Sequence, residues 1–182
     1  MKHSSVYFLK ALQFRLWSYL AFFIMVLFHS TNLVAQANDS LPPPYKRFPV
    51  LPPFELKGVN DNLIKRDDMA KRKATLVMFF SPDCHHCIDQ FNQLNNVKKD
   101  FEKYNLVMAT YQPMEQLQEF YKQYGLETWK NLYIGRDEKY FLPTYYRLSN
   151  LPFIALYDRK GKLIETFENT TPAARILSTL EQ

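Results

Sequence analysis

The 182-residue chain has few of the residues on which several common kinds of site depend. It contains four glycines, which argues against a glycine-rich phosphate-binding loop or a flexible repeat array. Its two cysteines are too few for a disulfide-stapled scaffold or for a four-cysteine zinc site within one chain. With 47% hydrophobic and 23% charged residues, the composition is that of a folded domain with a sizeable core.

Acidic residues are absent from residues 1–37, in which three basic residues precede or adjoin an apolar run over 16–28. The run is short for a bilayer span, which needs about 20 apolar residues. Ala35-Gln36-Ala37 then supplies the small residues of a cleavage site. This pattern predicts a signal peptide over 1–37 and an exported, periplasmic or otherwise extracytoplasmic protein. The alternative is an uncleaved membrane anchor through residues 16–34.

Most of the formal net charge of +5 belongs to this segment, because removing its three basic residues lowers the charge to +2. The other basic stretch, Lys65-Arg66 and Lys71-Arg72-Lys73, is interrupted by Asp67-Asp68, which is typical of a solvated loop. We therefore expect no nucleic-acid partner.

The remaining chain divides by composition into two parts. Residues 38–53 are rich in proline, which predicts an extended, polyproline-like tether. Residues 54–182 form the expected globular domain, in which strands alternate with helices before a closing hairpin and helix. This order predicts an α/β fold, a three-layer sandwich with a mixed central sheet flanked by helices. The expected strands lie at 54–58, 63–64, 74–80, 105–111, 131–134, 151–157 and 162–167, and the expected helices at 88–101, 113–124 and from Pro172 onward, with Thr171 as N-cap.

The residues that carry chemistry are Cys84-His85-His86-Cys87, which follow a buried strand and open an amphipathic helix. A C-x-x-C can be half a zinc site, a structural bridge or a redox pair. At a helix start, unpaired backbone N–H groups and the helix dipole stabilise the thiolate that disulfide exchange requires. Cys87 would then attack a mixed disulfide formed on Cys84.

A metal site is disfavoured because His85 and His86 are the only histidines after residue 37, and both lie inside the motif. Four consecutive residues are poorly placed to surround one ion tetrahedrally. We therefore predict Cys84 and Cys87 as the catalytic residues, with no metal and no cofactor other than their own disulfide. A metal shared between two chains stays open.

The chain resembles the thioredoxin superfamily, and within it the exported TlpA/ResA-like thiol–disulfide oxidoreductases, or redoxins, from about Pro53 to the C-terminus. The resemblance is carried by Pro53-Phe54-Glu55-Leu56, by the strand and C-x-x-C, and by Tyr146–Pro152 before the last hairpin. It implies a thioredoxin-like fold with an insertion over 112–135. Its implied partners are protein thiols or disulfides and a membrane or periplasmic electron donor.

The same resemblance implies a cis peptide bond before Pro152, packed against the C-x-x-C. The backbone of Leu151 would then pair with an extended substrate segment. The alternative is an ordinary strand-initiating proline. Four aromatic residues, Tyr140, Phe141, Tyr145 and Tyr146, either line a peptide-binding surface nearby or pack in the core and its rim.

Three positions depart from the family pattern. Asp83 replaces an aromatic residue before the first cysteine, and Met78 and Gln90 stand where relatives carry carboxylates that help move a proton from the resolving thiol. We hypothesise that His85 or His86 takes over this role, because an imidazole with a pKa of about 6.5 exchanges protons at neutral pH.

Neighbouring residues give opposing indications of whether the site oxidises or reduces its substrates. His86 precedes the second cysteine as in oxidising DsbA-like motifs, and a nearby imidazolium stabilises the reduced thiolate. Asp83 opposes this effect through its negative charge. The family resemblance favours a reductase. The alternatives are a DsbA-like oxidant and a redox-inactive, thioredoxin-like binding adaptor, with a peroxidase or a metal carrier less favoured.

Overall fold

The computed structural model describes Trp17 and residues 41–182. Residues 43–182 form one compact unit, distinct from residues 1–42. The predicted signal peptide, Trp17 excepted, lies outside the described residues. Among the residues that are described, no helix is both long and apolar enough to cross a membrane.

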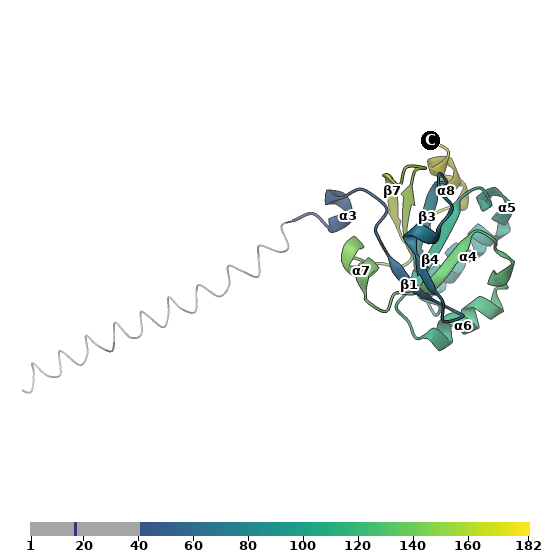
Figure 1. Cartoon of the computed structure of the whole chain (residues 1–182), viewed down its shortest axis with the longest axis horizontal. Coiled ribbons are helices and arrows are strands. Elements are labelled where there is room, and N and C mark those ends of the chain that lie inside the picture. The colour runs from purple at the N-terminus through teal and green to yellow at the C-terminus, as the bar shows by residue number, and fades with distance from the viewer. Residues whose placement is uncertain (1–16, 18–40) are drawn as a thin grey trace, which may run out of the picture. The chain divides into compact units, whose positions relative to one another are not determined.

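The compact unit is built on a seven-stranded sheet with the order β2-β1-β5-β4-β3-β6-β7 (Figure 1). Strands β3, β4 and β5 run parallel, and every other neighbouring pair is antiparallel. The mixed sheet that the sequence predicts is therefore confirmed. The strands are β1 (Glu55–Gly58), β2 (Leu63–Lys65), β3 (Thr75–Phe79), β4 (Asn105–Thr110), β5 (Leu132–Arg136), β6 (Phe153–Tyr157) and β7 (Leu163–Glu168).

Helices cover both faces of the sheet and complete the three layers (Figure 1). One face is packed by α4 (His85–Asn96), α5 (Lys98–Phe101), α6 (Met114–Gln123) and α8 (Ala173–Leu180). The other face is packed by two short helices, α3 (Pro44–Arg47) and α7 (Phe141–Tyr146). Two 3₁₀ turns, η1 (Arg66–Asp68) and η2 (Leu126–Thr128), lie in connections.

The two hydrophobic clusters are separated by the alternation of side chains along the central strands. In β3, Leu76 and Met78 join the cluster under α4, whereas Val77 and Phe79 join the cluster under α7. This alternation is the geometric consequence of the strand's two-residue period. Both clusters come wholly from residues 45–180, so the compact unit contains its entire core.

The expectation of an extended tether over 38–53 is wrong for residues 44–47, which form α3. Pro44 occupies the first turn of that helix, where a missing N–H costs nothing. Tyr45 is buried against Tyr146 and Phe153, with ring centroids 5.6 and 6.1 Å away. The folded unit therefore begins about ten residues before position 54, where the sequence places it.

Two helix boundaries also differ from the sequence-based expectation. Helix α8 begins at Ala173 with Pro172 as its N-cap, whereas Thr171 was expected there. The helix expected over 88–101 is interrupted at Val97, which separates α4 from α5. Helix α7 was not predicted.

We predict that Tyr45→Ala lowers the free energy of unfolding by about 2–4 kcal/mol, because it leaves a cavity between α3 and the sheet. Phe48→Ala is the matched control. Phe48 lies three residues further along with 60% of its surface exposed, and its replacement should change stability by less than about 0.5 kcal/mol. Urea unfolding of both variants measures the difference. Equal effects would show that α3 does not belong to the folded unit.

Candidate active site

The C-x-x-C lies at the start of α4, a few residues after the fully buried strand β3. After β3, residues Ser81-Pro82-Asp83 make the turn, and Cys84 is the N-cap of α4. The backbone N–H of Cys87 donates to the Cys84 Sγ at 3.3 Å, so the sulfur takes the place of a capping oxygen. Cys84 is half-buried, and its sulfur lies at the positive end of the helix dipole.

Cys87 lies one turn into the helix and is fully buried. Burial raises the pKa of the Cys87 thiol well above its ordinary value, and the hydrogen bond with Cys84 raises it further. A hydrogen bond with the Ser81 backbone lowers the pKa of Cys87, whereas the negative charge of Asp83 raises it. The two cysteines are free in the structure, and only Cys84 is partly open to solvent.

A short polar chain fixes Asp83 beside the motif. The Ser81 hydroxyl donates to the Asp83 carboxylate, and the Gln112 side-chain amide donates to the Ser81 oxygen at 3.0 Å. Gln112 comes from the segment after β4, the parallel neighbour of β3. Sequence reasoning missed Gln112, because nothing in the local pattern signals a contact that depends on the pairing of two strands.

The side chains of both histidines are exposed to solvent. His85 is 84% exposed at its side chain, and its Nε2 lies 3.4 Å from the Asp89 carboxylate one turn along α4. The His86 side chain is exposed as well. Within the described residues, neither imidazole makes a hydrogen bond to Cys84 or Cys87. The hypothesis that one of them accepts the Cys87 proton therefore stays a prediction.

The peptide bond between Leu151 and Pro152 is cis, as the sequence predicts. Pro152 immediately precedes Phe153, which pairs with Phe79 at the end of β3. The motif and the cis-proline are thus brought to the same end of two neighbouring strands. Leu151 is half-buried, and no hydrogen bond from the described residues reaches its backbone N–H or carbonyl.

The loop between β7 and α8 ties the cis-proline to the motif helix. The Asn169 N–H donates to the Pro152 carbonyl at 2.9 Å, and the Thr170 hydroxyl donates to the His86 carbonyl at 3.3 Å. Sequence reasoning missed the role of this loop, because its Asn169-Thr170-Thr171 matches only a glycosylation pattern and does not signal a contact with α4.

Gln90, on α4, makes a further hydrogen bond to the loop between β7 and α8. It is fully buried, and its Oε1 accepts the Thr171 N–H at 2.7 Å. Its Nε2 has no hydrogen-bond partner in the described part of the chain. Because Gln90 lies three residues after Cys87 on the buried side of α4, the two side chains are neighbours. Met78 is also fully buried and offers no proton acceptor.

The aromatic residues before Pro152 belong mainly to the core. Tyr145 and Tyr146 are buried, and the Tyr146 and Tyr157 hydroxyls are 2.7 Å apart. Phe141 is half-buried. Only Tyr140 is largely exposed, and it stacks on Tyr111. Packing therefore accounts for Tyr145 and Tyr146.

In the described residues, no three His, Cys, Asp or Glu side chains are grouped so that they could hold an ion.

The AhpC/TSA family model matches residues 50–178, more than two thirds of the chain. No curated protein sequence matches this chain. The exposed lipoprotein thioredoxin Etrx1 of Streptococcus pneumoniae strain TIGR4 is 26% identical, with a TM-score of 0.59 over 71% of this chain and 98% of its own.

Two further solved structures share the fold at lower identity. One is a protein of Chlorobium tepidum described as a candidate thiol:disulfide interchange protein, DsbE, at 21% identity and a TM-score of 0.61, covering 78% of this chain and 99% of its own. The other is the peroxidoxin BcpB of Mycobacterium tuberculosis, at 12% identity and a TM-score of 0.61, covering 72% of this chain and 94% of its own. The chain therefore belongs to the AhpC/TSA family, and its fold is that of the thioredoxin-superfamily oxidoreductases.

Proposed function

We propose that this protein is an exported thiol–disulfide oxidoreductase that acts on protein substrates and works in the reducing direction. The observation that carries the proposal is the unequal placement of the two sulfurs. Cys84 caps a helix at the protein surface, whereas Cys87 is fully buried one turn behind it. An accessible attacking sulfur and a protected resolving sulfur are what a two-step exchange requires.

In the first step, the Cys84 thiolate attacks one sulfur of a substrate disulfide. A mixed disulfide forms, and the other substrate sulfur leaves as a thiolate and is protonated. Cys87 then loses its proton and attacks the Cys84 sulfur, which forms the Cys84–Cys87 disulfide and releases the second substrate thiol. The substrate gains two electrons, and a membrane or periplasmic thiol donor restores the dithiol.

The substrate is expected to bind beside the cis-proline. The Leu151 backbone is free of hydrogen bonds from the described residues and lies at the end of the sheet where the motif stands. An extended substrate segment can pair with this backbone and hold its disulfide against Cys84. The hydrogen bonds of Asn169 and Thr170 link the cis-proline to the start of α4.

The charges near the sulfurs support the reducing direction. A couple is oxidising when positive charge stabilises its reduced, thiolate form. Here the Asp83 carboxylate helps to raise the pKa of Cys87. The exposed His85 is paired with Asp89 rather than with a sulfur. Apart from the helix start at Cys84, the reduced form therefore gains no stabilising positive charge from these side chains.

Export rests on the sequence of residues 1–37, where a basic start, an apolar run and small residues follow one another. The Streptococcus pneumoniae protein that shares this fold is described as an exposed lipoprotein. We propose the same side of the membrane for this domain, whether or not the leading segment is removed.

We predict that the protein catalyses reduction of insulin by dithiothreitol and that Cys84→Ser lowers this activity by about 100-fold or more, because the nucleophile is lost. Circular dichroism of both proteins checks that the variant is folded. A wild-type protein without activity would contradict the proposal and favour a binding adaptor. Consumption of hydrogen peroxide in place of insulin reduction would favour a peroxidase.

We predict that Gln90→Glu speeds the resolving step severalfold near neutral pH. The variant keeps the acceptor for Thr171, replaces the unpaired amide, and puts a proton acceptor beside the Cys87 thiol. Stopped-flow release of a thiol from a Cys84 mixed disulfide, followed across pH, measures the step. In the wild type the rate should rise with pH, because the raised pKa of Cys87 keeps its thiol protonated at neutral pH.

Gln93→Glu is the matched control for this experiment, since Gln93 lies on the same helix without a contact to the motif. It should leave the pH profile unchanged. A Gln90→Glu profile identical to that of the wild type would show that this position does not reach the Cys87 proton.

A further inference from the structure

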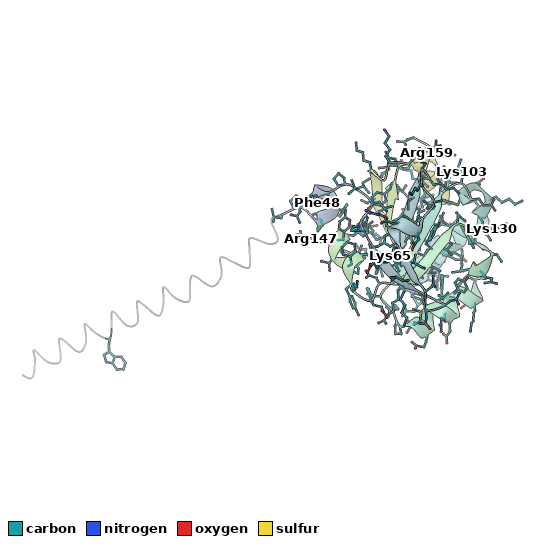
Figure 2. The ribbon with its side chains drawn as sticks, in the orientation of Figure 1. Phe48, Lys65, Lys103, Lys130, Arg147 and Arg159 are labelled. Carbon is teal, nitrogen blue, oxygen red and sulfur yellow. The ribbon has the colours of Figure 1, made fainter. Side chains whose placement is uncertain are left out.

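The end of the sheet opposite the active site carries an unusual concentration of positive charge. Two adjoining hollows of about 520 and 570 Å³ lie there, beside the start of β3 and the turn between β6 and β7. They share Arg72, Lys73, Asp158, Arg159 and Lys160 among their lining residues. Figure 2 shows Arg159 and Lys103, which both line the second hollow, at the same end of the domain.

Five cations of this end make no ion pair within the described residues, and we call them the basic face: Lys71, Arg72, Lys73, Arg159 and Lys160. The acidic groups nearby are already engaged. Asp158 accepts the backbone N–H groups of Lys160 and Lys162 at 2.7 and 2.8 Å. Asp67 pairs with Arg66 at 3.0 Å, and Glu181 pairs with Lys103 at 3.0 Å. Among the described residues that line the hollows, Asp158 is thus the one acidic side chain without an ion pair, and the five cations outnumber it.

Exposed apolar side chains adjoin the basic face. Val50 lines the first hollow and is 54% exposed, and Phe48, two residues earlier, is 60% exposed. This segment is held against the β6–β7 turn, because Val50 bridges to Lys162 and the Leu51 N–H donates to the Gly161 carbonyl at 2.8 Å. Lys46 and Arg47 precede it in α3. Val50 thus lines the same hollow as the five cations, whereas Phe48 lies outside both hollows, beside α3 (Figure 2).

We propose that the basic face, together with Phe48 and Val50, docks on a lipid bilayer that contains anionic headgroups. Cations attract the headgroups, and exposed apolar side chains enter the boundary between headgroups and acyl chains. The short stretch of chain between the apolar leading sequence and the domain supports a bilayer as the binding partner. In the alternative in which residues 16–34 stay as a membrane anchor, the nine residues from Ala35 to Pro43 span at most about 32 Å.

Docking through this face leaves the redox site open. Thr75 and Tyr157 pair at the docking end of β3 and β6, whereas Phe79 and Phe153 pair at the end that carries Cys84 and Pro152. The protein would meet its substrates on the side turned away from the bilayer. The proposal is independent of the direction of the redox reaction.

The test measures binding of residues 43–182, which contain both hydrophobic clusters, to phosphatidylcholine vesicles with and without phosphatidylglycerol. Sedimentation should show binding to the anionic vesicles only. Raising NaCl from about 0.1 M to about 0.5 M should weaken it at least tenfold, because salt screens exposed charges. Lys71→Gln/Arg72→Gln/Lys73→Gln should weaken it at least tenfold as well. Phe48→Ser should weaken binding without changing its dependence on salt.

The control triple variant is Lys99→Gln/Lys122→Gln/Lys130→Gln, which removes the same charge from exposed positions outside both hollows. Figure 2 shows Lys130 on another side of the domain. This variant should bind as the wild type does, and both triples should keep full insulin reductase activity. Equal loss in both triples, equal binding to neutral vesicles, or no binding would overturn the proposal. If soluble glycerol phosphate, at the same concentration as the phosphatidylglycerol, displaced the protein from the vesicles, the basic face would be assigned to a soluble phosphate ligand instead.

Discussion

All five residues of β3 are buried, and the strand is paired on both edges, with β4 on one side and β6 on the other. The chain therefore leaves the sheet at a fixed point, and α4 begins there against the hydrophobic cluster that contains Phe91. Cys84 is held at the helix start by this geometry, and Cys87 is carried inward with the first turn. The difference in burial between the two sulfurs, on which the proposed chemistry rests, follows from how this one strand is packed.

The same strand pairing assembles the rest of the site from distant parts of the chain. Because Phe153 pairs with Phe79, the cis-proline arrives beside the motif, and the loop after β7 then reaches both. The opposite end of the same strands carries the basic face. A redox site at one end and a docking surface at the other would orient the domain, with the sheet as the rigid spacer between them.

Sequence patterns with a local cause were predictable. The apolar run of β3, the C-x-x-C at a helix start and the proline before the last hairpin each have a short-range signature. Contacts that depend on tertiary packing were not predictable. Helix α7 contains Pro143, and its first N–H groups are capped by the buried Asp137, which accepts from Phe141 and Leu142 at 3.1 and 2.7 Å. The prolines before Tyr45 are typical of an extended tether, and only the tertiary structure shows that Tyr45 is buried against Tyr146.

The proposed reducing direction requires that burial of Cys87 and the negative charge of Asp83 outweigh the stabilisation that the start of α4 gives to a Cys84 thiolate. The reduction potential of the Cys84–Cys87 pair, measured in glutathione buffers, tests this claim most directly. Known couples span about −270 mV for thioredoxin to about −120 mV for DsbA. We expect a potential below about −200 mV, and a value above about −150 mV would contradict the reducing direction.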